Sequence, residues 1–474
     1  MSFDLEALRK KARTHGQEHV FAFWDKLSPA EQTKLAAQLN AVDFELVARL
    51  KEEFLAEKPG AKTAPKLAPA PVIAVPKTSA ERDDAAAAAK AGAEALSKGR
   101  VGAFLVAGGQ GTRLGLSGPK GAFEIGPLSK RTLFQVHAEK IAALRKKYGC
   151  KMPWVIMTSD ANDKATEEFF AQHKFFGLGA DTVRFCVQEN MPAVDRAGRL
   201  LLETPGTLAL SPNGHGGSIK ALFDSGCTQW LRGFGVDTLY YFQVDNVLTQ
   251  IGDPVFVGQH LRADAEMSSK VVRKRDWKEK VGVVGFVDGK LGVIEYSDLP
   301  ESEAKATEAS GELRFWAGSI AIHVLDVGFI ERLNKGGFQL PYHKAEKAVP
   351  CVGADGQPVK PKPGEKNGIK FETFVFDALP LARAAITLET KREDDFAPVK
   401  NADGEDSPAT ARALLNGFAA RALEAAGAKV PWKADGTPDC TLEVSPLAEL
   451  TPENLAKWGA KEIKAGAQLQ LPKP

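Results

Sequence analysis

Cysteine is scarce in this sequence of 474 residues, and the few cysteines follow no pattern. There are five, an odd number, and no two have the C-x-x-C spacing. They are Cys150, Cys186, Cys227, Cys351 and Cys440. This scatter argues against a disulfide framework and against a zinc site, and it favours a reducing compartment.

Long apolar runs are also missing, and so is an excess of charge of one sign. No window approaches the length of a membrane span, and the segment MSFDLEALRK contains acids where a signal peptide has its apolar segment. The formal net charge is only +2, without a stripe of basic and aromatic residues, which argues against nucleic-acid binding. We therefore expect a soluble cytoplasmic protein with no nucleic-acid and no membrane partner.

The length allows two or three domains, and the composition changes along the chain mark their boundaries. Residues 1–56 have helical apolar spacing, and Ser28-Pro29 is typical of a helix start. Residues 57–87 begin with a stretch rich in Pro, Ala and Lys and predict a linker. We expect a catalytic core over 88–384 and a smaller C-terminal unit over 385–474.

Strand patterns and helix patterns alternate in the first part of this core. We expect strands over 101–107, 154–158, 183–188 and 239–245, helices over 134–148, 163–175 and 217–234, a hairpin over 281–296 and a returning strand over 315–324. Alternation of this kind predicts a parallel sheet covered by helices on both faces. Ligands of such sheets bind beyond the carboxyl ends of the strands.

The most informative stretch is VGAFLVAGGQGTRLGLSGPKG, residues 101–121. Its apolar start predicts a buried parallel strand, and the glycines that follow make a loop whose backbone N–H groups can approach an anion. Arg113 and Lys120 add two positive charges to this loop. A strand followed by a loop with few side chains and two cationic residues is suited to binding a triphosphate.

Two common nucleotide-binding loops do not match this stretch. In the P-loop, Lys is followed by Ser or Thr, whereas Lys120 is followed by Gly121. The dinucleotide fingerprint G-x-G-x-x-G requires glycine where Leu114 stands. These mismatches argue against a P-loop kinase and a dehydrogenase.

The wording GGQGTRLG followed by PKG resembles the signature of nucleotide-sugar pyrophosphorylases, and most of all the UDP-N-acetylhexosamine pyrophosphorylase branch of the UDP-sugar pyrophosphorylase family. The similarity runs from about Gly16 to Arg412 in the order of the family. It implies an α/β fold with a doubly wound, mixed but mainly parallel sheet of the Rossmann-like nucleotide-diphospho-sugar transferase type. It also implies a helical N-terminal extension and a small C-terminal unit.

The resemblance implies a uridylyltransferase that makes a UDP-sugar and pyrophosphate from UTP and a sugar-1-phosphate, by direct attack on the α-phosphorus. Arg113 would hold the departing phosphates, Lys120 would lie near the α-phosphate, and Lys400 would reach the phosphates. Asp245 would lie at the phosphates and bind Mg²⁺, the implied cofactor. The alternative is a non-catalytic protein that binds a nucleotide-sugar and acts through its helical extension; a monomer or weak homo-oligomer is expected.

For the nucleotide, Gln188 resembles the glutamine that reads the uracil edge, because an amide pairs with both a ring carbonyl and a ring N–H. Gly214 lies in a family loop that approaches the base. The implied nucleotide-binding residues are Ala107, Gly108, Gly109, Gly111, Thr112, Gln188, Gly214 and Asp245.

For the sugar, the implied residues are His215, Gly282, Glu295, Ser319, Lys370, Phe374 and Phe376. Two of them depart from the N-acetylhexosamine branch, which has asparagine at the positions of His215 and Ser319. Histidine and serine offer different donors and shapes from asparagine. Glucose-1-phosphate and an N-acetylhexosamine-1-phosphate therefore both remain possible substrates.

Overall fold

The computed structural model describes residues 3–55, 65–359, 361–362 and 364–472, which form two compact units. The first unit comprises Met1–Ala64, Gln188–Ser218 and Gln339–Val375. The second comprises Pro65–Val187, Ile219–Phe338 and Phe376–Pro474. Two segments of the expected 88–384 core thus group with the N-terminal helices.

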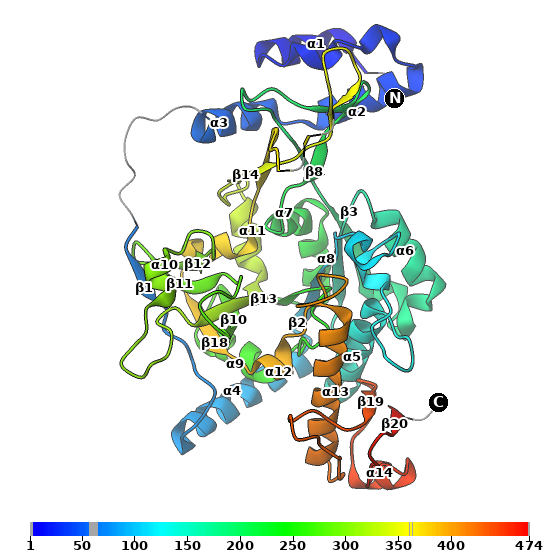
Figure 1. The fold of residues 1–474 in the computed structure, drawn as a ribbon, viewed down its shortest axis with the longest axis vertical. Coiled ribbons are helices and arrows are strands. Elements are labelled where there is room, and N and C mark those ends of the chain that lie inside the picture. The colour runs from blue at the N-terminus through cyan, green and yellow to red at the C-terminus, as the bar shows by residue number, and fades with distance from the viewer. Residues whose placement is uncertain (1–2, 56–64, 360, 363, 473–474) are drawn as a thin grey trace. The chain divides into compact units, whose positions relative to one another are not determined.

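The helical N-terminus is confirmed, and each helix begins at a polar cap. The helices are α1 (Leu5–Thr14), α2 (Pro29–Ala41) and α3 (Phe44–Phe54), coloured blue in Figure 1. Ser28 and Glu31 form a capping box before α2, with Pro29 in its first turn. Apolar faces of these helices form one core with Val194, Leu200 and Phe371, from the other segments of the unit.

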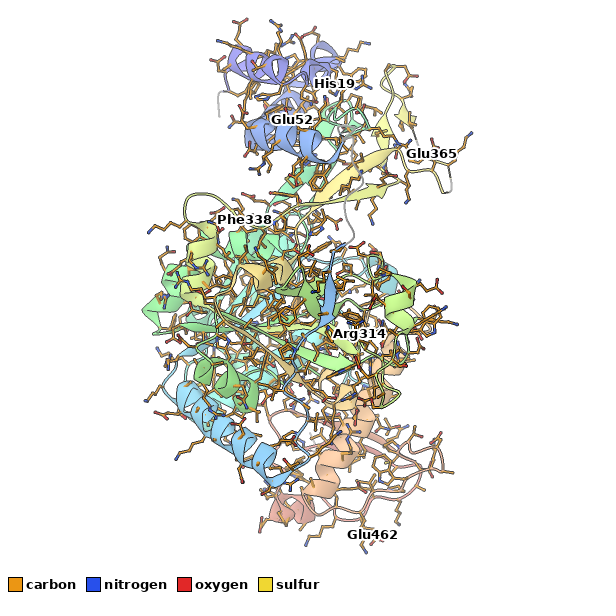
Figure 2. All side chains as sticks on the ribbon, turned by 90° about the vertical axis from the view of Figure 1, so that its left-hand side faces the viewer. His19, Glu52, Arg314, Phe338, Glu365 and Glu462 are labelled. Atoms are coloured by element: carbon orange, nitrogen blue, oxygen red, sulfur yellow. The ribbon has the colours of Figure 1, made fainter. Side chains whose placement is uncertain are left out.

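Short antiparallel pairs make up the rest of the first unit. They are β5 (Asn190–Pro192) with β8 (Leu210–Pro212), β6 (Leu202–Thr204) with β7 (Thr207–Leu208), β14 (His343–Lys347) with β17 (Gly368–Glu372), and β15 (Cys351–Val352) with β16 (Pro358–Val359). His19, labelled in Figure 2, lies with its Nε2 2.8 Å from the Leu200 carbonyl oxygen. This bond ties the helical segment to the β6 region.

A ten-stranded mixed sheet dominates the second unit. Its strands are β1 (Leu67–Pro69), β2 (Val101–Val106), β3 (Trp154–Ser159), β4 (Val183–Gln188), β9 (Thr238–Gln243), β10 (Met267–Arg273), β11 (Val283–Val287), β12 (Lys290–Ile294), β13 (Ala317–Asp326) and β18 (Ala385–Glu389). The main order is β1-β11-β13-β9-β2-β3-β4, with β10 beside β13 and β18. Strand β2 runs parallel to both β3 and β9, whereas β13 is antiparallel to β9, β10 and β11.

Helices accompany this sheet, as the alternating pattern predicts. They are α4 (Ser79–Ser97), α5 (Leu133–Tyr148), α6 (Asp163–Gln172), α8 (Cys227–Gly233), α9 (Pro254–Arg262), α10 (Glu301–Lys305), α11 (Val327–Asn334) and α12 (Arg392–Asp395); α7 (Gly217–Asp224) spans the unit boundary. Helices α4 and α9 pack closely (Figure 1), because a Cβ at Gly92 would lie 2.0 Å from the Pro254 carbonyl oxygen and one at Gly258 1.8 Å from that of Ala88.

The end of the chain forms α13 (Pro408–Ala425), β19 (Thr441–Val444), α14 (Pro452–Lys457) and β20 (Gln468–Leu471). The two strands pair in parallel and share an apolar cluster with α13. Asn416 joins helix to strand, since its Nδ2 donates to the Cys440 carbonyl oxygen and its Oδ1 accepts from the Leu442 N–H.

Most predicted elements are confirmed, and one is wrong. The Asp288-Gly289 turn joins β11 and β12 with φ of 49° and 81°, as a tight hairpin requires. The helix expected over 217–234 is instead two helices, α7 and α8. They are separated at Gly226, whose φ of 70° a continuing helix cannot accommodate.

The predicted linker is structured over its second part; residues 56–64 lie outside the described residues. Strand β1 pairs with β11, and Ile73 donates its N–H to Thr387 and accepts from the N–H of Glu389. Helix α4 starts at Ser79, capped by Thr78. Among the described residues no helix is both long and apolar enough to cross a membrane.

Candidate active site

The sheet topology brings two loops of the second unit together. Strands β2 and β9 are parallel neighbours, with Val106 opposite Gln243, and the Val244 N–H donates to the Val106 carbonyl oxygen at 3.1 Å. The glycine-rich loop after β2 and Asp245 after β9 therefore leave the sheet at the same edge. This is the edge at which α/β sheets bind ligands.

Lys120 and Asp245 meet at this edge. The Lys120 Nζ lies 3.2 Å from the Asp245 Oδ2, and the two side chains are only 17% and 12% exposed. A carboxylate in so enclosed a place requires a cation or a metal ion. The pair thus places one positive and one negative side chain together at this edge of the sheet.

The glycine-rich loop is held by its own backbone. The Lys120 N–H donates to the Gly109 carbonyl oxygen at 3.1 Å, and the Gly111 N–H to that of Gly118 at 2.9 Å. A Cβ at Gly109 would meet no atom within 4 Å, so that side of the loop opens onto free space. Arg113 lies on the exposed turn Thr112–Leu114.

Ser159 and Asn162 were missed by the sequence analysis, yet they fix this loop. Asn162 Nδ2 donates to the carbonyl oxygens of Ala107 and Gly109, at 2.8 and 3.1 Å. Ser159 Oγ donates to the Gly108 carbonyl oxygen at 2.8 Å. Three successive carbonyl groups are thus occupied by protein donors. The polar run directly after the second predicted strand, 154–158, was the available signal.

The segment after Asp245 is held by the last residue of α12 and by residues that follow this helix. The Val399 N–H donates to the Asp245 carbonyl oxygen at 3.0 Å. Asn246 Nδ2 donates to the Asp395 carbonyl oxygen at 2.7 Å, and its Oδ1 accepts from the Ala397 N–H at 2.9 Å. Asn246 is 2% exposed, so these bonds lie in the interior and hold Asp245 in place.

One cavity of ≈ 140 Å³ gathers predicted residues from distant parts of the sequence, namely Asp245, Ser319 and Lys400. Lys400 Nζ pairs with the Asp406 Oδ2 at 3.2 Å. Arg275 and Glu279 also line the cavity, and the sequence analysis did not find them.

Among the residues expected to bind sugar in the second unit, Ser319 lines this cavity. The Ser319 N–H donates to the Gly282 carbonyl oxygen at 2.8 Å. A Cβ at Gly282 would lie 2.7 Å from Val293 and 3.3 Å from the Glu295 Oε1, so only glycine fits beside that carboxylate. Phe376 also belongs to this unit and is 8% exposed.

The remaining predicted residues belong to the first unit. Gln188 is 4% exposed, and its Nε2 donates to the Asn213 Oδ1 at 2.8 Å and to the Gly214 carbonyl oxygen. Gly214 has a φ of 81°, and a Cβ there would lie 2.3 Å from the Thr373 carbonyl oxygen. Asn213 is a further residue that the sequence analysis missed.

His215 has a defined tautomer. Its Nδ1 accepts from the Val375 N–H at 3.1 Å, so the ring proton of the neutral form is on Nε2. Burial, aided by His343, lowers the pKa of His215 to about 4, which keeps the ring neutral at pH 7. Phe374 lies between the two histidines, with ring centroids 5.2 Å from His215 and 4.8 Å from His343. Lys370 lies on β17 opposite Ala345.

A metal ion at this site would take part of its ligands from substrate phosphates. Among the described residues no group of three or more His, Cys, Asp or Glu side chains is arranged to hold a metal ion. Mg²⁺ commonly binds through one or two carboxylates and substrate phosphates. The carboxylate of Asp245, beside the glycine-rich loop, fits that donor set.

Known proteins resemble this chain over nearly its whole length. The model of the family described as UTP–glucose-1-phosphate uridylyltransferase matches residues 50–414. UDP-N-acetylglucosamine diphosphorylase 2 of Arabidopsis thaliana is 36% identical over 475 residues, which cover 95% of this chain and 91% of that protein. UDP-N-acetylglucosamine pyrophosphorylase of Saccharomyces cerevisiae is 36% identical over 464 residues, 94% of this chain and 95% of that protein.

Solved structures give the same result for the fold. The crystal structure of the uridine diphosphate N-acetylglucosamine pyrophosphorylase from Trypanosoma brucei has a TM-score of 0.79 at 29% identity, covering 96% of this chain and 95% of that one. UDP-glucose pyrophosphorylase from Leishmania major shares the fold with a TM-score of 0.60 at 16% identity, covering 94% of each chain. The expected α/β fold with a mixed sheet is thereby confirmed.

Proposed function

Because the chain belongs to the UTP–glucose-1-phosphate uridylyltransferase family, we propose that it transfers the uridylyl group of UTP to a sugar-1-phosphate. An oxygen of the sugar phosphate attacks the α-phosphorus of UTP. The bond from the α-phosphorus to the bridging oxygen breaks, and pyrophosphate leaves with that oxygen. The products are a UDP-sugar and pyrophosphate.

The chain's own part in this reaction is to position the phosphates and offset their charge. In the second unit, the N–H groups of the glycine-rich loop and Arg113 bind the β- and γ-phosphates, and Lys120 binds the α-phosphate. The Lys120 ammonium already pairs with the carboxylate of Asp245. When UTP binds, its phosphate replaces this carboxylate as the anionic partner of Lys120. Lys400, which lines the cavity with Asp245, provides a further positive charge.

We assign Mg²⁺ as the cofactor, held by Asp245 together with substrate oxygens. When bound, it supplies positive charge that offsets the phosphates. Asp245 is suited to this role because backbone and side-chain bonds on both sides fix its position.

The first unit supplies the residues assigned to the base. Both N–H donors of the Gln188 amide are used by Asn213 and Gly214. The uracil N3–H would therefore donate to the Gln188 Oε1, and the preference for uracil over cytosine follows, since cytosine has no proton at N3.

Two observations bear on the sugar. The relatives from Arabidopsis thaliana and Saccharomyces cerevisiae are named for N-acetylglucosamine, which supports N-acetylglucosamine-1-phosphate. The resemblance implies asparagine in that branch at the positions of His215 and Ser319, and this difference supports glucose-1-phosphate. Gly282 and Glu295 would hold hydroxyl groups of either sugar.

The observation that carries the proposal is the Lys120–Asp245 pair at the carboxyl edge of β2 and β9. The test is pyrophosphate release from UTP with a panel of sugar-1-phosphates, with and without Mg²⁺. We expect release that requires both a hexose-1-phosphate and the metal. UDP-sugar binding without turnover of any panel member would instead favour a non-catalytic protein acting through its helical extension.

The proposed setting follows from the remaining features. All five cysteines are free thiols, in keeping with a reducing cytoplasm. We propose that the protein acts there as a monomer or weak homo-oligomer, with UTP and a sugar-1-phosphate as its partners.

A further inference from the structure

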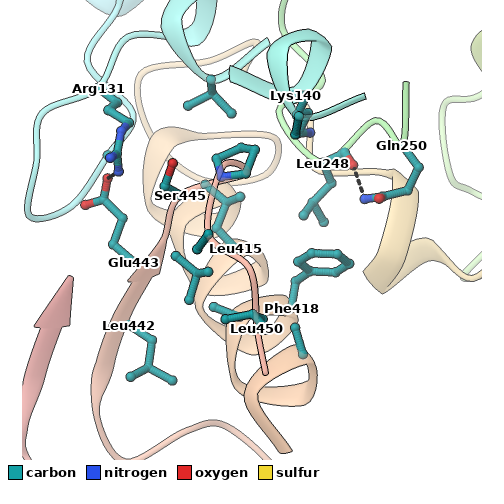
Figure 3. Close-up of a pocket in the computed structure, with 18 of the residues that line it drawn as sticks. Arg131, Lys140, Leu248, Gln250, Leu415, Phe418, Leu442, Glu443, Ser445 and Leu450 are labelled. Carbon is teal, nitrogen blue, oxygen red and sulfur yellow. Dashed lines mark hydrogen bonds and ion pairs between the residues drawn. The ribbon is translucent and has the colours of Figure 1, made fainter. Parts of the chain in front are cut away.

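A second cavity, of ≈ 340 Å³, lies in the second unit between α5, α13 and β19. Its walls come from two apolar clusters, with Val136 and Leu248 from the main core and Ala419 and Leu442 from the C-terminal cluster. Figure 3 shows Leu415, Phe418, Leu442 and Leu450 along its lower part. Folded cores contain few voids of this size, and about 300–1,000 Å³ is usual for small-molecule sites.

The charges of this cavity are mainly positive. Arg131, Lys140 and Lys147 line it, against the single carboxylate of Glu443. Arg131 is already paired. Its Nη1 lies 3.1 Å from Glu443 (Figure 3), and its Nε lies 2.9 Å from Glu139. Those two carboxylates also accept from the hydroxyls of Ser445 and Ser129. This side of the cavity is therefore a satisfied polar network.

Lys140 lies at the upper end of the cavity in Figure 3. Unlike Arg131, it forms hydrogen bonds with uncharged acceptors. Its Nζ donates to the carbonyl oxygens of Val247 and Thr249, at 2.6 and 2.9 Å. An ammonium has three N–H donors, and these bonds use two of them. Burial lowers the pKa of Lys140 to about 7, and only Asp395 opposes this effect. An anion beside the amine would offset that desolvation.

We propose that this cavity binds a small amphipathic anion, an apolar molecule with one carboxylate that pairs with Lys140. The apolar part packs among the leucines and Phe418 in the lower part of the cavity. The carboxylate lies at the wall formed by the segment that follows Asp245. The site is separate from the proposed uridylyl transfer and does not depend on it.

The test uses octanoate as the probe and 1-octanol as its neutral match of equal chain length. Isothermal titration of the whole chain should show one octanoate per chain and a rise in melting temperature. Octanol should bind on the order of tenfold or more weakly, because its hydroxyl carries no negative charge to pair with the ammonium. No octanoate binding, or equal binding of the two probes, would overturn the proposal.

Two variants, each with a matched control, test whether octanoate binds in this cavity. Ala422→Phe fills the cavity from α13 and should lower octanoate affinity on the order of tenfold or more, whereas Ala413→Phe adds the same bulk at an exposed position of that helix and should not. Lys140→Met should reduce octanoate binding to the level of octanol, whereas Lys146→Met, which removes an exposed charge of α5 outside the cavity, should not. Unchanged octanoate affinity in folded Ala422→Phe would contradict the site.

Discussion

Lys120 and Asp245 are 125 residues apart in the sequence, and their side chains lie 3.2 Å apart because β2 and β9 are parallel neighbours. Lys120 lies in the loop that follows β2, and Asp245 lies just after the end of β9. The pair is mostly shielded from water, so its two charges interact more strongly than a surface pair does. The predictions about turnover follow from this relationship.

Lys120→Ala should remove most turnover without unfolding the protein. The ammonium is the charge assigned to the α-phosphate, and loss of one positioned donor typically lowers kcat about 10²–10³-fold. Pyrophosphate release under saturating UTP measures the effect. Lys98→Ala, which removes a surface partner of Glu94, is the matched control. A Lys120→Ala enzyme as fast as the parent would exclude the assigned role.

Asp245→Asn should raise the Mg²⁺ concentration that the reaction needs. The amide keeps the size of the carboxylate but loses its charge, so the Mg²⁺ concentration that gives half-maximal rate should rise about tenfold or more. A Mg²⁺ titration of the initial rate, with circular dichroism to check folding, makes the comparison. If the half-maximal concentration does not move, Asp245 does not bind the metal.

Gly109→Ala separates folding from phosphate binding. A Cβ at this position would meet no protein atom within 4 Å, so thermal stability should stay at the parent value. The methyl group would instead occupy the space proposed for UTP phosphates, and the KM for UTP should rise about tenfold. Gly233→Ala, which also meets nothing within 4 Å, should leave the KM unchanged. Equal KM values for the two variants would place the phosphates elsewhere.

Asn162→Asp tests whether the loop carbonyls must be held. Aspartate keeps the acceptor for the Ser159 N–H but cannot donate to Ala107 and Gly109. We expect kcat/KM for UTP to fall and the free energy of unfolding to drop by about 1–3 kcal/mol, because buried acceptors lose their donors. Urea denaturation and initial rates on the same preparation distinguish this from a purely catalytic effect, in which stability would not change.

The sequence predicted the strands of the core well, because buried parallel strands are short apolar runs that end at glycine or polar residues. Strand β4 matches its prediction over Val183–Gln188. The loop after β2 was recognised from its glycine-rich sequence GGQGTRLG. Strand β10 was missed, although the antiparallel strands β11, β12 and β13 were predicted. Strand β10, Met267–Arg273, contains Ser268, Ser269 and Lys270, which are polar yet buried, so its composition does not indicate an interior strand.

Side-chain partners between distant segments could not be predicted at all. The polar run after the strand marks Asn162 as a candidate, but nothing local in the sequence identifies its partners in the loop after β2. The partners of Asn246, which are Asp395 and Ala397, are equally hidden. Such pairs depend on topology, which a single sequence leaves open. Charged residues were found more readily, because Arg113 and Lys120 stand in a loop otherwise poor in side chains.

Acid should destabilise the protein through buried histidines. Burial lowers the pKa of His137 to about 3 and that of His260 to about 4, whereas unfolded histidine titrates near 6.5. Between these values the unfolded chain binds the proton and the folded chain does not, so stability falls as the pH falls from 6.5 toward 4. Above 6.5 both states are neutral and the effect is absent. The slope is about 1.4 kcal/mol per pH unit for each histidine.

His137→Gln isolates one of these contributions. Glutamine can still donate to the Val244 carbonyl oxygen, which His137 Nε2 contacts at 3.1 Å, but it does not titrate. Urea unfolding at several pH values should show a slope smaller by about 1.4 kcal/mol per pH unit below 6.5. His173→Gln, at an exposed position, should leave the slope as it is. A parent-like slope in His137→Gln would show that this histidine is protonated in the folded state.

His215→Asn should move sugar preference toward the acetamido substrate. The asparagine Oδ1 can accept from the Val375 N–H in place of the His215 Nδ1, while its amide presents a donor of different shape. We expect the ratio of kcat/KM for N-acetylglucosamine-1-phosphate to that for glucose-1-phosphate to rise about tenfold, with the KM for UTP unchanged. His343→Asn, which alters the second histidine in contact with Phe374, is the control and should leave the ratio near the parent value. Because His215 is neutral above about pH 5, the altered ratio should be the same at pH 6.5 and pH 8.5. A variant whose KM for UTP rises while the sugar ratio stays fixed would assign His215 to the nucleotide instead of the sugar.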